Sequence, residues 1–399
     1  MSPVRLRKRA AGLLFGAGVV FLMGTNAQAG WLLVIAALLV GAVLAGTLLP
    51  FAGLRNLRAE LVAPDEATQG EAAYVDIRLW HAGRGVRWGI RVADDHLAPT
   101  DAYVDAVRPG ERIEITTART PVRRGRRRAT HAVVRTAAPF GVAERRRQLT
   151  VDGETLVLPS VVPLGPLPFV DPVGTAGSAI HPAPRRGYGP EYLGIREYRT
   201  GDSMRHVHWA STARHGAVMV REFEEEQTRR LLIVVDTEHD AEPDGDEPSS
   251  LDRCCTVAAS LAAAALAHGH GSRLAAATAD GLQLIARSDE AAVLRWLAEL
   301  APSGVPFATA ASEVPFDVIR GAETVVLIAP AWDDGRSVVR AVEAFADTVP
   351  RVVCVAVGSG PDRDDPALHA TGAALVAAGA EVYPWPVGGD LAALLGAAP

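Results

Sequence analysis

The chain has 399 residues, with 46 Asp and Glu, 40 Lys and Arg and a formal net charge of −6 at pH 7. This length accommodates two globular domains and a membrane segment. The mild acidic balance gives no general reason to expect nucleic acid as a partner. The odd number of cysteines, Cys254, Cys255 and Cys354, excludes the paired disulfide framework of a small secreted domain, so a reducing compartment is expected.

The first 54 residues are predicted to form a transmembrane helical hairpin. Residues 10–54 contain no charged side chain, and one continuous helix of this length would measure roughly 68 Å, about twice the hydrocarbon core of a bilayer. The polar interruption at residues 24–30 is therefore expected to be a turn between two spans, residues 10–23 and 31–49. Residues 1–54 thus predict a two-span anchor whose partner is the lipid bilayer.

Positive charges flank the hairpin on both sides, and the positive-inside rule then places both ends in the cytoplasm. An alternative is that the start of the chain is a cleaved signal peptide, with residues 27–29 at the cleavage site. The span at residues 31–49 would then still stop transfer. Under both interpretations we expect a cell-membrane protein with a cytoplasmic body. The flanking residues are Arg5, Arg7, Lys8 and Arg9 before the hairpin and Arg55 and Arg58 after it.

Residues 55–165 show short alternating runs rather than long amphipathic helices. In residues 73–80, Val75, Ile77 and Leu79 fall on one face of a strand and polar or aromatic residues fall on the other. Residues 112–116 and 132–136 have similar patterns, and Gly- and Pro-containing turns separate the runs. Several short strands at this spacing predict a small β-sandwich-like domain.

The basic run at residues 123–128 contains five arginines. One interpretation is a patch that binds nucleic acid or anionic lipid. The other is a solvated hairpin turn, and it is favoured because no aromatic residue alternates with the arginines.

Residues 166–229 contain a Pro- and Gly-rich linker and then a junction rich in charged and aromatic side chains. Asp202 is a plausible N-cap and Gly216 a plausible C-terminal cap, which predicts one helix over residues 203–215. Residues 218–223 are predicted to form a strand. Three interpretations of the junction stay open: a partly buried network of ion pairs, a recognition surface for a partner protein, and a catalytic site.

The histidines of the junction do not form a convincing catalytic or metal site. His206 and His208 are two residues apart, so on a helix they point about 200° away from each other and cannot share an ion. His208 and Ser211 are spaced like a base and a nucleophile, but the sequence around them lacks a strand–turn–helix elbow. No catalytic residue is therefore predicted.

The junction resembles the domain of unknown function 58 family, membrane-anchored proteins associated with MoxR. The shared pattern is Arg-x-Tyr-x-x-Gly-Asp-x-x-Arg-x-(Ile/Val)-x-Trp-x-x-(Ser/Thr)-Ala-Arg-x-Gly, and the resemblance extends over nearly the whole chain. It departs at Ala210, where relatives often carry Lys or Arg, which weakens a charge-based role there. The residues expected to bind a partner or form the junction are Glu191, Tyr192, Arg196, Tyr198, Gly201, Asp202, Arg205, Trp209, Arg214, Arg221 and Glu222; Val207, Thr212, Ala213, Gly216 and Phe223 also match.

Residues 230–399 are predicted to form a doubly wound α/β domain, because an apolar run at residues 230–236 begins a regular alternation of strands and helices. The resemblance implies a von Willebrand factor A-like domain. Residues 254–267 are expected to be too short and too weakly apolar for a third span. The other expected strands are 272–278, 324–329, 351–357 and 381–383, and the helices are 251–267, 290–300, 337–346 and 366–378.

The metal site of von Willebrand factor A domains uses Asp-x-Ser-x-Ser after the first strand, and this chain has Asp-Thr-Glu-His-Asp at residues 236–240. Both serines are replaced, but the carboxylates of Asp236, Glu238, Asp240 and Asp333 could still hold a hard cation such as Mg²⁺; the alternative is a polar rim at the strand ends. No other cofactor is expected, because no phosphate-binding glycine motif occurs.

Two functions follow from these patterns. The first is a non-enzymatic, membrane-anchored bacterial adaptor that binds protein partners, and the resemblance implies a MoxR-type AAA+ ATPase as the partner. The second is a metal-dependent enzyme or a ligand-binding protein that uses the carboxylates at the strand ends.

Overall fold

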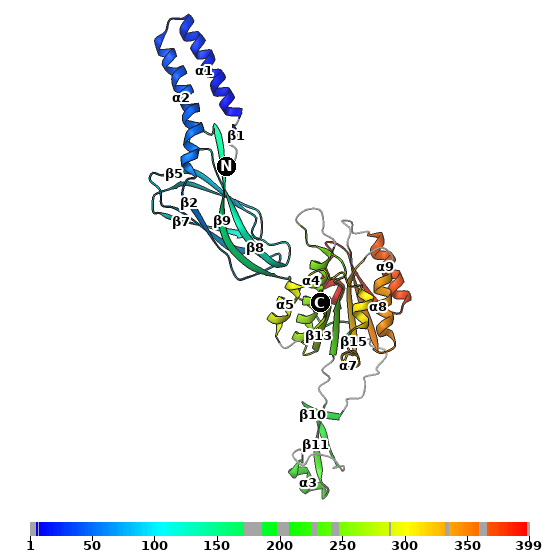
Figure 1. Cartoon of the computed structure of the whole chain (residues 1–399). Helices are drawn as coiled ribbons and strands as arrows, with labels where there is room; N and C mark the ends of the chain where they lie inside the picture. Colours follow the sequence, from blue (N-terminus) through cyan, green and yellow to red (C-terminus); the bar gives the residue numbers. More distant parts are fainter. Residues whose placement is uncertain are drawn as a thin grey trace. The chain divides into compact units, whose positions relative to one another are not determined.

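The computed structural model describes residues 5–6, 8–170, 186–197, 207–224, 230–240, 247–286, 289–331, 335–358 and 365–396 (Figure 1). Of these, residues 5, 6, 8, 52, 186–197, 210, 215, 221–224 and 286 are described by their backbone alone. The chain divides into two compact units. The first unit contains Met1–Ser160, Glu242–Asp252 and Ala291–Leu300. The second unit contains Val161–Ala241, Arg253–Glu290 and Ala301–Pro399.

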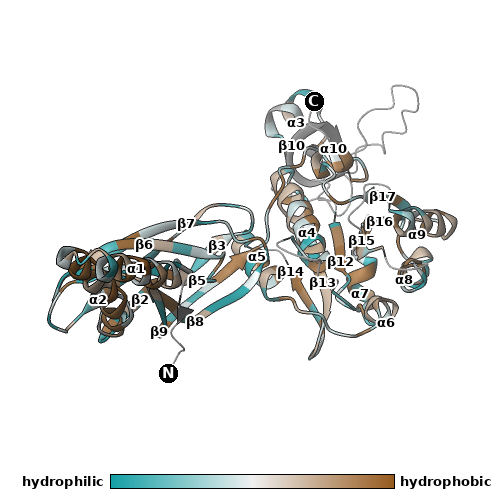
Figure 2. Ribbon diagram, turned by 90° about the horizontal axis from the view of Figure 1, so that it is seen from above, coloured by the Kyte–Doolittle hydropathy of each residue, from teal (hydrophilic) through white to brown (hydrophobic). Residues whose placement is uncertain are grey.

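The N-terminal hairpin consists of α1 (Lys8–Asn26) and α2 (Gly30–Gly53), joined by a turn within the predicted interruption. Both helices are long and apolar enough to span a membrane, and only 17% of each apolar window is buried inside the protein. Large apolar side chains such as Phe15 and Leu38 are exposed, and both helices are coloured mainly toward the hydrophobic end of the scale in Figure 2. This surface suits a lipid environment.

A third helix, α4 (Ser250–Ala267), also has the length and apolar composition of a span, contrary to the expectation from the sequence. Its apolar window is 78% buried inside the protein. Burial, rather than shortness or polarity, distinguishes α4 from the hairpin. A helix that is apolar on most sides belongs to the core of a large domain as readily as to a membrane.

The β-rich part of the first unit has two sheets. The three-stranded sheet has the order β2-β4-β7, and the six-stranded sheet has the order β1-β9-β8-β5-β6, with β3 pairing in parallel with β9. The strands are β1 (Arg5–Leu6), β2 (Leu57–Val62), β3 (Glu66–Thr68), β4 (Ala73–His81), β5 (Arg87–Asp94), β6 (Thr100–Val107), β7 (Arg112–Arg119), β8 (Gly125–Thr136) and β9 (Ala143–Leu158).

One hydrophobic core lies between these sheets. It takes Val75, Ile77 and Leu79 from β4 and buried side chains such as Ile90 and Val134 from the larger sheet. The alternation predicted for residues 73–80 is confirmed, because the three aliphatic residues of β4 are at most 1% exposed. Two layers closed around one core are the arrangement expected of a sandwich-like domain.

The second unit is built on a six-stranded sheet of order β14-β13-β12-β15-β16-β17, parallel except for the edge strand β14. Its strands are β12 (Arg230–Val235), β13 (Gly271–Thr278), β14 (Gly281–Ala286), β15 (Thr324–Pro330), β16 (Arg351–Val357) and β17 (Glu381–Trp385). The sequence predicted every strand except β14, which returns antiparallel to β13 after a tight turn.

Helices cover this sheet on both faces. Leu232 and Val234 share a core with α6 (Phe307–Ser312), α7 (Phe316–Arg320), α8 (Arg336–Ala346) and α9 (Pro366–Ala377). Leu231 and Ile233 point to the opposite face and are also at most 2% exposed. A parallel sheet buried on both faces is the doubly wound arrangement. Two further helices are α5 (Glu290–Glu299), mostly in the first unit, and α10 (Leu391–Gly396).

Candidate functional site

The junction forms a small element of its own, in which α3 (Trp209–His215) precedes β11 (Met219–Glu224) and β11 pairs with β10 (Arg186–Glu197). The two strands are antiparallel, and their register shifts twice, around Tyr192. Gly194 lies opposite Glu222. The strand predicted for residues 218–223 is confirmed by β11.

The helix of the junction begins later than predicted from the sequence. Val207 forms an antiparallel bridge with Val220, and the His208 N–H donates to the Met219 carbonyl at 2.8 Å. Residues 207 and 208 are therefore extended, and α3 starts at Trp209. The predicted cap, Asp202, lies outside the described residues.

His208 caps α3 in place of the expected aspartate. Its Nδ1 accepts the Ser211 backbone N–H at 3.2 Å, and the Ser211 hydroxyl lies 2.8 Å from the same nitrogen. The pair spaced like a base and a nucleophile is in contact, but the ring nitrogen is held at a helix end that leaves several N–H groups without intrahelical partners. This geometry assigns His208 and Ser211 a structural role.

The other end of α3 is as predicted from the sequence. Gly216 has φ 68°, in the left-handed region, and its N–H donates to the Thr212 carbonyl at 3.0 Å. The Thr212 hydroxyl accepts the Met219 N–H at 3.0 Å and donates to the His208 carbonyl at 3.1 Å. A helix of only seven residues is thus fixed to β11 by side-chain bonds.

This element buries Val207 and Val220 and leaves Trp209 68% exposed. Arg214 on the same helix is also exposed. An exposed tryptophan is uncommon on a folded surface and is enriched where proteins bind each other. Of the other predicted residues, Glu191, Tyr192 and Arg196 lie in β10 and Arg221 and Glu222 in β11, whereas Tyr198, Gly201, Asp202 and Arg205 lie outside the described residues.

The second predicted site lies at the carboxyl end of β12. In the sheet this strand lies between β13 and β15, so the chain builds the sheet outward from β12 in both directions. Such a switch point is the usual ligand site of a doubly wound sheet. Asp236 lies here, 2% exposed, and its Oδ1 accepts the Glu238 N–H at 2.8 Å. Burial raises the pKa of Asp236 to about 7, and the nearby Glu238 carboxylate acts in the same direction, against the backbone hydrogen bond.

Glu238 is bonded to two helix starts. Its Oε2 accepts the Phe307 N–H of α6 and the Ser337 hydroxyl of α8, both at 2.9 Å. The preceding Thr237 donates its hydroxyl proton to the Ala277 carbonyl at 2.7 Å. These bonds join the end of β12 to β13, α6 and α8, and they occupy one of the two carboxylate oxygens of Glu238.

The described donors do not fit Mg²⁺, which requires near-octahedral oxygen ligands. Asp236 is almost fully buried, and Glu238 Oε2 already accepts two hydrogen bonds. Within the described part of the chain no group of three His, Cys, Asp or Glu side chains is arranged to hold a metal ion. Asp240 is half-buried, and Asp333 lies outside the described residues.

The basic run at residues 123–128 is not the solvated turn expected from the sequence. Arg124 is 7% exposed, and its Nη1 donates to the carbonyls of Leu300 at 2.7 Å and Ala298 at 3.2 Å, at the C-terminal end of α5. Its Nε lies 3.4 Å from a carboxylate oxygen of Asp252. Arg124 is therefore buried by contacts with residues that are far away in the sequence but belong to the same unit.

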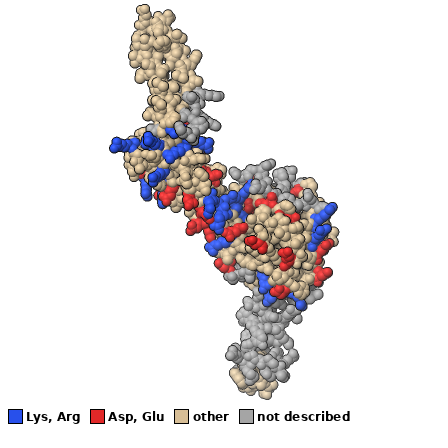
Figure 3. Space-filling model, in the orientation of Figure 1, with Lys and Arg blue, Asp and Glu red and all other residues tan. Residues whose placement is uncertain are grey.

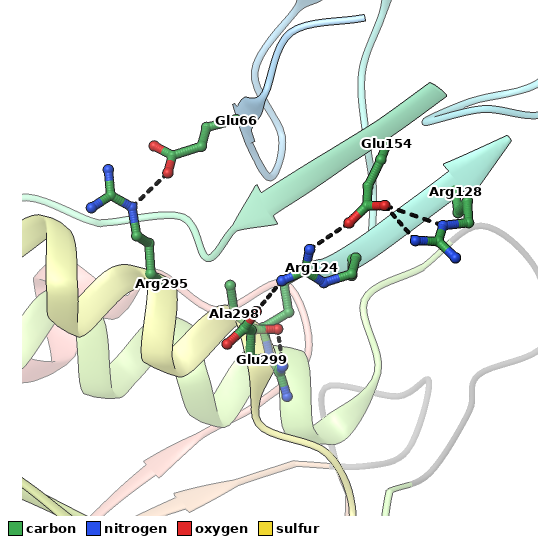
Figure 4. Close-up of polar contacts among 8 residues, drawn as sticks. Glu66, Arg124, Arg128, Glu154, Arg295, Ala298 and Glu299 are labelled. Atoms are coloured by element: carbon green, nitrogen blue, oxygen red, sulfur yellow. Dashed lines mark hydrogen bonds and ion pairs between the residues drawn. The ribbon is translucent and has the colours of Figure 1, made fainter. Parts of the chain in front are cut away.

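The neighbouring arginines of the run form exposed ion pairs (Figure 4). Arg128 pairs with Glu154 at 2.6 Å, and Arg126 pairs with both Glu154 and Glu299. Arg295 on α5 pairs with Glu66 of β3 at 2.6 Å. Three of the five arginines are thus paired with carboxylates within the first unit, which weakens the interpretation of the run as a nucleic-acid or lipid patch.

Comparison with known protein families finds one family that matches part of the chain. The family described as "Protein of unknown function DUF58" matches residues 194–357, which contain α3, β11 and most strands of the second sheet. No curated protein matches the chain.

Solved structures add no functional argument. The CARDB domain of a Pyrococcus furiosus protein, in complex with di-metal ions, is 16% identical over 25% of this chain and 93% of its own, with a TM-score of 0.18. The beta-glucosidase of Listeria innocua is 15% identical over 25% of this chain and 16% of its own (TM-score 0.13). The alkylpurine DNA glycosylase AlkC of Pseudomonas fluorescens is 14% identical over 37% of this chain and 46% of its own (TM-score 0.18). Over residues 194–357 the chain is similar to a family of unknown function.

Proposed function

We propose that this chain is a non-enzymatic, membrane-anchored adaptor. The hairpin α1–α2 spans the cell membrane twice, the body is cytoplasmic, and the β10–β11–α3 element binds a protein partner. The resemblance of the junction makes a MoxR-type AAA+ ATPase the first partner to test. The basic residues on both sides of the hairpin, such as Arg9 and Arg55, support the cytoplasmic placement.

The exposure of Trp209 carries the proposal. This side chain is 68% exposed, yet the helix that bears it is capped at both ends by His208 and Gly216. Presenting a large aromatic side chain on a fixed backbone costs little conformational entropy on binding, which is how most interface anchors act. The exposed Arg214 on the same helix adds a second side chain of the type that dominates interfaces.

We also propose that the second unit is von Willebrand factor A-like. Its doubly wound sheet and the buried Asp236 at the end of β12 support this assignment. The two serines of the metal motif are replaced by Glu238 and Asp240, and Glu238 binds backbone and hydroxyl groups. A domain of this kind serves as a scaffold beside the junction.

Capture of a MoxR-type ATPase by the full chain in detergent tests the adaptor function. We expect Trp209→Ala to weaken capture by about 30-fold, as for an interface anchor worth about 2 kcal/mol. Arg214→Ala should weaken it less. Phe316→Ala is the matched control, because Phe316 is a 62% exposed aromatic residue on α7. Equal capture by wild type and Trp209→Ala excludes α3 as the contact.

The alternative is a metal-dependent enzyme or ligand-binding protein, and the burial of Asp236 at the switch point is the observation in its favour. Calorimetric titration of the full chain with Mg²⁺, Mn²⁺ and Ca²⁺ decides between them. Heat that disappears in Asp236→Asn would support the alternative. The adaptor function predicts no heat that depends on Asp236.

A further inference from the structure

The loop between β8 and β9 packs into the hairpin. Val142 is fully buried, in a cluster with Ala10 of α1 and Val43 of α2. A Cβ at Gly46 of α2 would lie 3.0 Å from the Val142 side chain and 3.6 Å from Phe140 Cβ. The absence of a side chain at Gly46 therefore allows the loop to lie directly against α2.

This loop extends alongside the last turns of the apolar span of α2. The candidate span of α2 ends at Phe51, and Gly46 precedes it by five residues, or about 7 Å along a helix axis. Phe140 therefore lies beside a part of α2 that belongs to the apolar span. Its side chain is 50% exposed, as expected of an aromatic residue that faces lipid rather than a protein core.

Arginines surround the base of the same loop. The Arg145 guanidinium lies over the Phe51 ring at 4.3 Å from its centroid, and Arg147 donates to the Leu54 carbonyl at 2.7 Å. Figure 3 shows basic side chains gathered where the hairpin meets the β-rich part of the first unit. Aromatic and basic residues in one belt are characteristic of a membrane interface.

A cavity of about 490 Å³ opens beside the loop, and its charged lining consists of three arginines and two acidic residues. Arg9, Arg91 and Arg135 line it together with Asp101 and Glu144. Arg91 pairs with Asp101 at 3.3 Å. The Arg135 Nε is buried and has no hydrogen-bond partner among the described residues. A buried donor without an acceptor is costly, so an anion that supplies the acceptor would be stabilised here.

A separate apolar groove of about 410 Å³ lies along α2, lined by side chains from Val34 to Ala45 and by Phe140. Phe140 lines both the basic cavity and the apolar groove. A basic cavity next to an apolar groove matches the two ends of a phospholipid.

We propose that cavity and groove together bind one anionic glycerophospholipid. Its phosphate accepts hydrogen bonds from Arg9 and Arg135, and an acyl chain lies along α2 beside Phe140. The site recognises the anionic headgroup through arginine, which bonds phosphate more specifically than a point charge would. This inference rests on the proposed membrane anchoring and adds a lipid ligand to it.

The test measures lipid retained by the full chain. The protein is reconstituted in vesicles of equal parts phosphatidylglycerol and phosphatidylcholine, extracted with mild detergent, and its bound lipids are counted by native mass spectrometry. We expect phosphatidylglycerol to be retained in several-fold excess. Arg135→Gln and Arg9→Gln should each reduce that preference by about fivefold, the effect of one basic residue near an anionic surface. Arg135→Lys should keep part of it.

Two variants separate a specific site from general effects. Arg127→Gln changes an arginine of the same strand, β8, eight residues before Arg135, and should leave the preference unchanged. Phe140→Ser should lower retention of both lipids alike. Equal retention of the two lipids by wild type, or equal losses in Arg127→Gln and Arg135→Gln, overturns the proposal.

Failure of the anchor itself gives a different result. If the hairpin does not span the membrane, the wild-type chain is released from cell membranes by alkaline carbonate before any lipid is measured. A chain that resists carbonate but shows no lipid preference contradicts only the lipid site.

Discussion

Arg119 and Asp94 form a fully buried ion pair that joins the two sheets of the first unit. Arg119 ends β7 and Asp94 ends β5, and both side chains have 0% exposed surface. Arg119 Nη2 donates to Asp94 Oδ2 at 2.9 Å, and Nη1 contacts Oδ1 and donates to the His96 carbonyl at 2.7 Å. The Arg119 Nε donates to Thr117 Oγ1 at 3.0 Å. These bonds compensate the desolvation of both charges.

Removing one member of this pair should strongly destabilise the first unit. We expect Arg119→Met or Asp94→Asn to lower the free energy of unfolding by about 3–5 kcal/mol, because each leaves a charge buried without its counterpart. The measurement is thermal or denaturant unfolding of the detergent-solubilised chain. Arg78→Met is the matched control, because Arg78 pairs with Glu114 on an exposed surface, where such pairs contribute at most about 1 kcal/mol. Similar losses in Arg119→Met and Arg78→Met would contradict the prediction.

His96 should make the first unit acid-sensitive. Burial and then the positive charge of Arg119 lower the pKa of His96 below its usual 6.5. The unfolded chain then binds more protons than the folded one at pH values below 6.5. The contribution of neutral His96 to the free energy of unfolding is therefore fully present above that pH and is lost as the pH falls. One proton gives a slope of at most about 1.4 kcal/mol per pH unit. His96→Gln should flatten the stability profile in this range, whereas the exposed His131→Gln should not.

The alternation in β4 was readable from the sequence, because one face of the strand meets a core and the other meets solvent. The neighbours Val75 and Tyr74 therefore point to opposite faces of the strand, and their exposed fractions are 0% and 67%. The parallel strands of the second unit were equally clear, since strands buried on both faces appear as continuous apolar runs. The local pattern of apolar residues was enough to predict these strands, because their burial follows a regular period.

The sequence did not reveal contacts between distant segments. The acceptors of Arg124 lie 174 and 176 residues further along the chain, so a run of arginines looked solvated. The start of α3 was misplaced for a related reason, because pairing of Val207 with Val220 overrides the local helix signal. The basic cavity was missed as well, since Arg9, Arg91 and Arg135 come from three separate elements.

Replacing Asp236 by asparagine should stabilise the second unit at alkaline pH. The folded state raises the pKa of this carboxyl from 3.8 to about 7, so its contribution to stability falls as the pH rises from 3.8 through 7. Asparagine can still accept the Glu238 N–H and carries no charge. We expect Asp236→Asn to gain on the order of 2 kcal/mol more at about pH 8 than at about pH 5, measured by thermal unfolding without divalent cations. An equal effect at both pH values would show that burial of the charge is not the cause.

Arg124 should matter more than the rest of its basic run. Its guanidinium satisfies the carbonyls of Ala298 and Leu300 at the end of α5 and faces Asp252 in a buried setting. Arg124→Met leaves the two carbonyls without this donor and removes the buried positive charge beside Asp252, so the free energy of unfolding should fall by about 3 kcal/mol or more. Arg128→Met removes only an ion pair whose arginine side chain is 64% exposed and should cost less than about 1 kcal/mol. Unfolding of both variants under one condition measures the difference. Equal losses would mean that Arg124 acts as a surface charge, and that these α5 carbonyls find other donors.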